Sequence, residues 1–171
     1  MSVSETAYID ANVIIYHIFP LEASGAAHKK TVRLIMDVEE GKLKLAISTF
    51  TIGEIKATSK RLLAKALNRI PNEDELKKIA DEVERTLSDW GVDIYDAERL
   101  ITPARTLIIT EAERIIDFSI PIKTTDDKWH MIGFADALAA LFASKIPTKY
   151  FATFDVAFRG LKWSVTPMVL W

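Results

Sequence analysis

Residues 150–158 of the chain read Tyr-Phe-Ala-Thr-Phe-Asp-Val-Ala-Phe. A short apolar run ends at Thr153, and an acid, Asp155, follows two residues later. Apolar runs of this length with polar residues at their ends are typical of buried strands. In open α/β sheets, functional side chains gather just beyond the C-terminal ends of the strands. This stretch therefore predicts a buried strand that ends at a candidate functional acid.

The same pattern occurs twice more along the chain. Residues 7–9 are apolar and lead to Asp10, and the apolar residues 45–47 are followed by Glu54 within a few positions. Helical periodicity separates these strands, which predicts βαβ units and a mostly parallel sheet with both faces covered. Because right-handed crossovers bring the C-terminal ends of parallel strands to one edge, we expect Asp10, Glu54 and Asp155 to converge there.

The expected elements cover nearly the whole chain, which we interpret as a single domain, residues 1–171. Strands are predicted at 7–10, 45–49, 92–95, 150–153 and, as a short fifth, 163–165. Helices are predicted at 12–19, 28–40, 51–67, 73–89, 102–116 and 132–144, with a polar loop at 121–130. The charged helical region at about 55–89 is interpreted as an extension of the domain.

The composition is that of a globular protein with a real core. The chain has 171 residues, a formal net charge of −2 and no cysteine. The lack of cysteine excludes disulfides, thiolate zinc sites and cysteine nucleophiles. There is no apolar run long enough to cross a membrane and no signal-peptide pattern at the N-terminus, so we expect a cytoplasmic protein without a membrane partner.

Asp136 stands out because it is the single acid among nine apolar neighbours in residues 134–143. Burying an unpaired carboxylate is very costly, so this side chain must be exposed, neutralised, paired or bound to a cation. The alternative is an acid in the first turn of a helix that complements the helix dipole. The residue pattern alone leaves both interpretations open.

The other acids also have ordinary explanations. Residues 51–54 form a capping-box pattern in which Glu54 closes the start of its own helix. Asp10 and Asp155 each follow a strand and precede a helix, where an aspartate commonly serves as N-cap. Four acids at one edge would repel one another unless cations neutralise them. A ligand set made of oxygens only suits Mg²⁺ or Mn²⁺.

These motifs resemble those of the PIN-domain ribonucleases, and most of all the VapC-type toxins of toxin–antitoxin pairs. The matching segments are residues 8–14, 48–54, 135–138 and 153–158, in the same order as in that family. The resemblance implies a three-layer α/β/α sandwich, with a mostly parallel central sheet of four or five strands, and a divalent-metal endoribonuclease. It further implies catalytic and metal-binding roles for four acids and supporting roles for two polar residues: Asp10, Glu54, Asp136 and Asp155, with Asn12 and Thr153.

The resemblance also suggests partners. An RNA substrate and an antitoxin protein are expected from it, and Arg159 and Lys60 are candidates for contacts with RNA phosphates. Exposed helical charges are the ordinary explanation of both cations. The apolar end of the chain, residues 168–171, suits a homodimer contact.

Other functions remain as alternatives. Toxins of this group are commonly shorter, and the extra length lies at about 55–89, so an RNA-processing nuclease without an antitoxin is a second possibility. A non-catalytic PIN-like module that binds RNA or protein is a third. A haloacid-dehalogenase-like phosphatase would need a second acid where Asn12 stands. A receiver domain would need an acceptor after the third strand, where Asp96 is a poor match.

Overall fold

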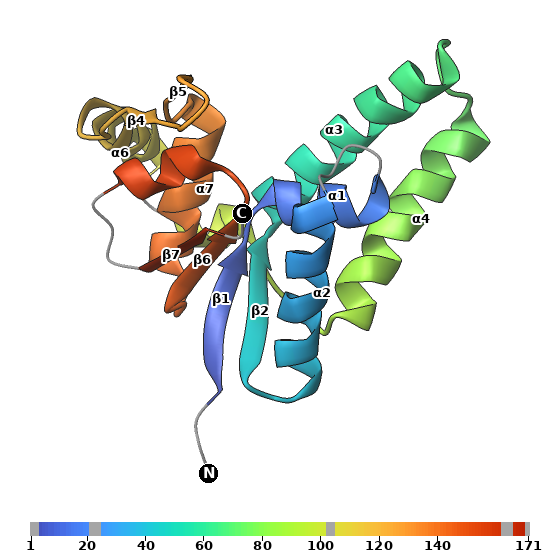
Figure 1. Cartoon of the computed structure of the whole chain (residues 1–171), viewed down its shortest axis with the longest axis horizontal. Coiled ribbons are helices and arrows are strands. Elements are labelled where there is room, and N and C mark those ends of the chain that lie inside the picture. The colour runs from blue at the N-terminus through green and yellow to red at the C-terminus, as the bar shows by residue number, and fades with distance from the viewer. Residues whose placement is uncertain (1–3, 21–24, 102–104, 162–165, 170–171) are drawn as a thin grey trace.

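The computed structural model describes residues 4–20, 25–101, 105–161 and 166–169. Its centre is a five-stranded sheet in the order β3-β2-β1-β6-β7, and every neighbouring pair is parallel (Figure 1). The strands are β1 (Glu5–Ile9), β2 (Leu43–Ser48), β3 (Asp93–Tyr95), β6 (Tyr150–Thr153) and β7 (Thr166–Val169). The predicted α/β class and parallel sheet are therefore confirmed.

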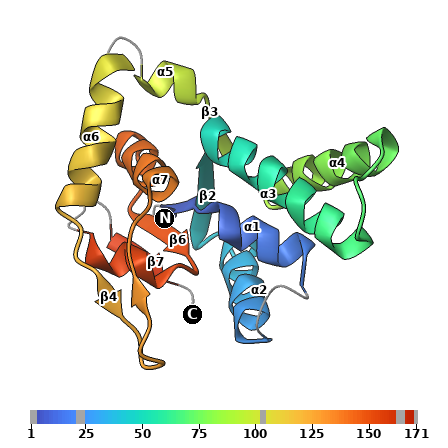
Figure 2. The ribbon, with the colours of Figure 1, turned by 90° about the horizontal axis from the view of Figure 1, so that it is seen from above.

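Helices cover both faces of this sheet, which makes three layers (Figures 1 and 2). One layer contains α1 and α2, together with the start of α3 and the end of α4; the other contains α6 and α7. The helices are α1 (Ala11–Ile18), α2 (Gly25–Glu39), α3 (Thr49–Leu67), α4 (Glu73–Asp89), α5 (Ala97–Ile101), α6 (Arg105–Asp117) and α7 (Phe134–Lys145). A short 3-10 helix, η1 (Val156–Gly160), follows β6.

Strand residues alternate between two apolar cores, one on each face. In β1, Ala7 and Ile9 pack into the core beneath α1 and α2, whereas Tyr8 packs into the core beneath α7. All three side chains are 0% exposed. Because both faces are covered, these strands need apolar residues at consecutive positions, which explains the uninterrupted runs in the sequence.

The structure differs from the sequence predictions in several places. Helix α2 begins at Gly25 rather than at 28, β2 begins at Leu43 rather than at 45, and the fifth strand, β7, is Thr166–Val169 rather than 163–165. Helix α3 begins at Thr49, with Ser48 as its N-cap, rather than at Thr51. The short helix α5 was not predicted. The predicted polar loop at 121–130 contains a small antiparallel hairpin, β4 (Ile122–Lys123) and β5 (Trp129–His130). The predicted helix start at 102–104 and strand at 163–165 lie outside the described residues.

Helices α3 and α4 form an arm that leans away from the sheet (Figure 1). Val83 of α4 is fully buried, and Lys56 of α3 pairs with Glu84 of α4 at 2.8 Å. Asn72 caps α4 through a reciprocal capping box with Glu75. This arm accounts for most of the charged region at 55–89. Within the described parts of the chain, no helix combines the length and apolarity needed to cross a bilayer.

A candidate carboxylate site at the edge of the sheet

Asp10 lies directly after β1, at the C-terminal edge of the sheet, and is only 7% exposed. It is the N-cap of α1, and its Oδ1 accepts a hydrogen bond from the backbone N–H of Ala11 at 2.8 Å. Its Oδ2 accepts from Asn12 Nδ2 and from Thr153 Oγ1, both at 2.7 Å. Three donors therefore fix the position and orientation of this carboxylate.

Asn12 and Thr153 join Asp10 to the neighbouring strand end. Asn12 Nδ2 also lies 3.1 Å from Thr153 Oγ1, and Asn12 Oδ1 accepts from the backbone N–H of Phe154 at 3.0 Å. Thr153 Oγ1 in turn accepts from the backbone N–H of Asp155 at 2.9 Å. These bonds connect the start of α1 to the segment after β6, so the backbone at Asp155 is positioned relative to Asp10.

The remaining three acids come from three other elements. Asp155 is the N-cap of η1 and accepts from Ala157 N–H at 2.8 Å. Asp136 is in the first turn of α7 and accepts from Gly133 N–H at 2.9 Å. Glu54 is half-buried on α3 and makes no hydrogen bond or ion pair within the described residues.

The structure agrees with the ordinary helix-start explanation for three of the four acids but not for Glu54. Asp10 and Asp155 are the N-caps of their helices, and Asp136 is an acid in the first turn of α7, as their alternative interpretations proposed. For Glu54 the capping-box interpretation was wrong. Because α3 begins two residues earlier, Ser48 accepts from Thr51 N–H and is the cap, and Glu54 is beyond the first turn. Its side chain is left without a local backbone partner.

Charge repulsion among these acids contributes to their raised pKa values. Burial raises the pKa of Asp10 to about 7, against the opposing hydrogen bonds, and the charges of Asp136 and Glu54 raise it further. Burial and the charge of Asp136 raise the pKa of Glu54 to about 6. Burial, together with the charge of Asp155, also raises the pKa of Asp136. The four carboxylates thus share one electrostatic environment.

The chemistry of these donors suits a hard cation, because the four side chains offer only carboxylate oxygens. Burial disfavours the ionised forms of Asp10, Glu54 and Asp136, and a bound cation would offset that cost. Among the residues described, no ion pair joins any of the four acids to a lysine, arginine or histidine. Equally, no group of three or more acids or histidines in the described chain is arranged to hold one ion. The side chains as placed form an anionic cluster rather than a closed cage.

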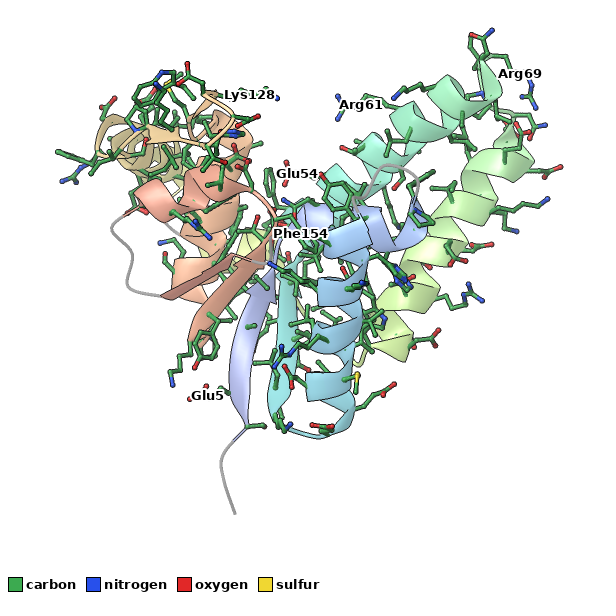
Figure 3. All side chains as sticks on the ribbon, viewed as in Figure 1. Glu5, Glu54, Arg61, Arg69, Lys128 and Phe154 are labelled. Carbon is green, nitrogen blue, oxygen red and sulfur yellow. The ribbon has the colours of Figure 1, made fainter. Side chains whose placement is uncertain are left out.

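The two candidate cations lie on the elements that carry Glu54 and follow Asp155. Lys60 on α3 and Arg159 on η1 are both exposed. In the view of Figure 3, Lys128, on the turn of the β4–β5 hairpin, and Arg61, on α3, are drawn above Glu54 and on either side of it. Lys56, nearer to Glu54 along α3, is instead paired with Glu84 of α4.

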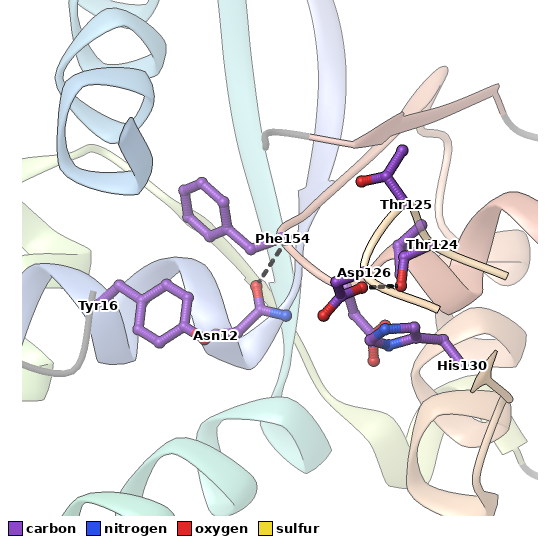
Figure 4. A pocket seen from close by; sticks show the side chains of 9 residues that line it. Asn12, Tyr16, Thr124, Thr125, Asp126, His130 and Phe154 are labelled. Carbon is purple, nitrogen blue, oxygen red and sulfur yellow. Dashed lines mark hydrogen bonds between the residues drawn. The ribbon is translucent and has the colours of Figure 1, made fainter. Parts of the chain in front are cut away.

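A cavity that sequence reasoning missed adjoins the cluster (Figure 4). It has a volume of about 550 Å³. One side includes Asn12, Tyr16, Phe154, Asp155 and Val156, and the other, formed by the hairpin, includes Thr124, Thr125, Asp126 and His130. A signal in the sequence that could have indicated this cavity is the position of His130, six residues before Asp136.

Comparison with known proteins gives a match at the level of structure. No family model matches the chain, and no curated protein matches its sequence. Among solved structures, the chain superposes with a TM-score of 0.60 on a chain of VapBC2 from Rickettsia felis. That crystal structure contains VapBC2 bound to a DNA fragment from the VapBC2 promoter. The identity is 13%, over 96% of this chain and 98% of that chain. At this identity the likeness establishes the fold.

Proposed function

We propose that the chain is a divalent-metal-dependent endoribonuclease of the PIN type, which hydrolyses RNA phosphodiester bonds. The observation that supports this proposal best is the buried Asp10, whose pKa is raised to about 7 beside two other acids. A carboxylate in this position is costly to the fold unless a cation offsets its charge. The fold shared with a chain of VapBC2 adds support, because VapC-type toxins are the group that the motifs resemble.

In the proposed mechanism Mg²⁺ or Mn²⁺ would be held by four acids: Asp10, Glu54, Asp136 and Asp155. Magnesium is commonly bound through one or two carboxylates, with water and substrate phosphate completing its shell, which suits acids that are not arranged as a cage. The bound metal would lower the pKa of a water molecule and stabilise charge at the phosphate. Asn12 and Thr153 orient Asp10 through their hydrogen bonds to its Oδ2.

The surrounding cations would bind the RNA backbone. Lys60, Arg61 and Arg159 are exposed on elements that adjoin the four acids, and Lys128 is exposed on the hairpin. Phosphate contacts from such side chains position a nucleic acid without reading its sequence. Binding is therefore expected to weaken as salt concentration rises.

The decisive experiment compares two variants with the same chemical change. Asp10→Asn removes the charge at the centre of the cluster, and Asp81→Asn removes an exposed charge on α4. With pure protein, Mn²⁺ and structured RNA, we expect Asp10→Asn to cleave at least ~100-fold more slowly, since metal-assisted stabilisation is worth several kcal/mol. Asp81→Asn and wild type should cleave equally, and EDTA should stop both.

Unchanged cleavage by Asp10→Asn would refute the assignment of the site. Binding of RNA by wild type without cleavage, in Mg²⁺ and in Mn²⁺, would instead favour the non-catalytic module.

A toxin role, with an antitoxin partner and a homodimer, is the finer part of this proposal. The superposition on nearly the full length of a VapBC2 chain favours the toxin role and the antitoxin partner, whereas the homodimer is suggested by the apolar residues 168–171. The test is co-purification with the product of an adjoining small gene, together with light scattering of the pure protein. Purification without any such partner would favour an RNA-processing nuclease, and a monomer at high concentration would remove the homodimer.

A further inference from the structure

The cavity beside the carboxylates combines an aromatic side with a polar side. The rings of Tyr16 and Phe154 lie 5.3 Å apart with their planes at 47°, on the side formed by α1 and the segment after β6. The hairpin forms the opposite side (Figure 4). A volume of about 550 Å³ is within the range of small-ligand pockets. A planar group that enters here would have aromatic surface on one side and polar groups on the other.

The polar side contains one carboxylate, that of Asp126, together with Thr124, Thr125 and His130. Asp126 accepts a hydrogen bond from Thr124 Oγ1 and pairs with Lys128 Nζ at 2.9 Å. These two partners lower the pKa of Asp126 to about 2, so at neutral pH it is ionised and acts only as an acceptor. A carboxylate has about four lone-pair positions, and the two partners leave some of them free for a ligand.

The hairpin holds this carboxylate on a structured turn. The backbone N–H of Thr124 donates to Lys128 C=O at 2.9 Å, and Asp127 N–H donates to Thr124 C=O at 3.0 Å. Lys123 pairs with Asp127 at 2.5 Å and lies over the ring of Trp129 at 5.6 Å. Asp127 is next to Asp126 but does not line the cavity.

We propose that this cavity receives one nucleobase of single-stranded RNA beside the bond that is cut, and that Asp126 selects guanine. The proposal rests on the function proposed above, because it takes RNA as the substrate. Proteins read single-stranded RNA by stacking unpaired bases on aromatic side chains and hydrogen-bonding their edges. Phe154 and Tyr16 provide the aromatic surface, and Asp155, which lines the same cavity, connects it to the carboxylate cluster.

Guanine is favoured by the chemistry of its Watson–Crick edge. Its N1–H and N2 amino group are adjacent donors and match the two oxygens of a carboxylate. Adenine and cytosine each present one amino group beside an acceptor nitrogen, and uracil presents one N–H between two carbonyl oxygens. A carboxylate that can only accept is repelled by each of these acceptors. A good bidentate pair discriminates by about 10-fold or more.

The test uses two neighbouring aspartates. Asp126→Asn replaces a cavity acceptor by an amide that both donates and accepts, and Asp127→Asn makes the same change outside the cavity. Asp127 has a φ of 66°, a conformation that asparagine also tolerates. Binding is measured by fluorescence anisotropy in EDTA, with labelled uridine nonamers that carry G, A, C or U at the centre.

We expect wild type and Asp127→Asn to bind the guanine oligonucleotide about 10-fold more tightly than the others. For Asp126→Asn this preference falls below about threefold. Cleavage sites on a random RNA pool with Mn²⁺ should show the same guanine preference at one position, again lost in Asp126→Asn alone.

Each result separates this proposal from the function on which it rests. Guanine preference in binding, without any cleavage, supports the cavity and refutes the nuclease. Cleavage with equal base preference in wild type, Asp126→Asn and Asp127→Asn supports the nuclease and refutes the cavity. An equal loss of guanine preference in Asp126→Asn and Asp127→Asn also refutes the cavity proposal. The loss would then come from the change of charge on the hairpin and not from a contact inside the cavity. Binding of arginine-rich peptides with no preference among RNAs would assign the cavity to a protein partner and overturn the proposal.

Discussion

At the scale of single residues, helix capping does not compete with a role in the site. Asp10, Asp136 and Asp155 each bond to a backbone N–H at the start of a helix, and their carboxylates still share one electrostatic environment. The sequence could indicate both roles for each acid, but it could not separate them. For Asp10 and Asp155, the reason is that a strand end followed by a helix start is a position that favours both roles.

Glu54 is the exception, and it shows where sequence reasoning failed. The pattern Thr51–Glu54 is a valid capping box, but Ser48 supplies an equally good cap three residues earlier. Tertiary contacts decide between them. Tyr8 Oη is 2.7 Å from both Ser48 Oγ and Thr51 Oγ1, so a fully buried tyrosine of β1 fixes where α3 begins. No local pattern contains that information.

The free side chain of Glu54 leads to a prediction in which stability and activity move in opposite directions. Burial and the charge of Asp136 raise the pKa of Glu54 to about 6, and no hydrogen bond within the described chain compensates. We expect Glu54→Gln to raise the free energy of unfolding by about 1 kcal/mol at pH 8, after allowance for its partial exposure. Cleavage should fall by about 100-fold or more.

Urea denaturation and cleavage assays measure the two effects, and Glu113→Gln, an exposed change on α6, is the matched control. Glu54→Gln protein that is less stable than wild type would show that Glu54 has a stabilising partner.

At the scale of elements, the long periodic helices and buried strands were predictable, but the β4–β5 hairpin was not. Residues 73–89 and 150–153 were predicted with the bounds that the structure has. The hairpin strands are two residues each, too short for any periodicity. Just before the hairpin, Ile120 N–H donates a hydrogen bond to Gly160 C=O at 3.0 Å, which connects this segment to the end of η1. The cavity was missed for the same reason.

Gly160 tests that contact. A Cβ at this position would lie 2.0 Å from the carbonyl oxygen of Ile120, so backbone must shift to admit it. We expect Gly160→Ala to lower the free energy of unfolding by about 1–3 kcal/mol, in the range of overpacking. The hairpin side of the cavity should also be displaced. We therefore expect weaker RNA binding, with little change in the positions of the four carboxylates.

The matched control is Gly53→Ala, where a Cβ meets nothing within 4 Å on helix α3. Because alanine is the better helix former, this control should raise stability by up to about 1 kcal/mol. Thermal denaturation of both variants is the measurement, and a Gly160→Ala protein as stable as wild type would contradict the close approach.

At the scale of the whole molecule, the sheet edge concentrates charge that the fold must tolerate. The order β3-β2-β1-β6-β7 puts β1 in the middle, so Asp10 follows the central strand and is the most deeply buried of the four acids. Parallel topology could be predicted from alternating strands and helices, and with it the common edge. The degree of burial of each acid could not be predicted from the sequence. It depends on side chains from α3, α7 and β6 that come together only in the folded protein.

This burial predicts how stability depends on pH in metal-free protein. The pKa of Asp10 is about 7 in the folded chain, against an ordinary value of 3.8. Between these values the folded state binds more protons than the unfolded state, so the free energy of unfolding falls as pH rises. The stabilisation by the protonated group is fully present below about pH 4 and is lost as pH rises through about 7.

Urea denaturation in EDTA from pH 4 to pH 8 tests this dependence by comparing wild type with Asp10→Asn. Other acids, such as Glu75, have lowered pKa values and contribute with the opposite sign, so the difference between the two proteins isolates Asp10. We expect wild type to lose on the order of a few kcal/mol relative to Asp10→Asn over this range. Mg²⁺ at pH 8 should restore part of this loss in wild type only, since a ligand stabilises the state that binds it. Parallel curves for the two proteins would show that Asp10 ionises as readily in the fold as in water, and the need for a cation at this edge would disappear.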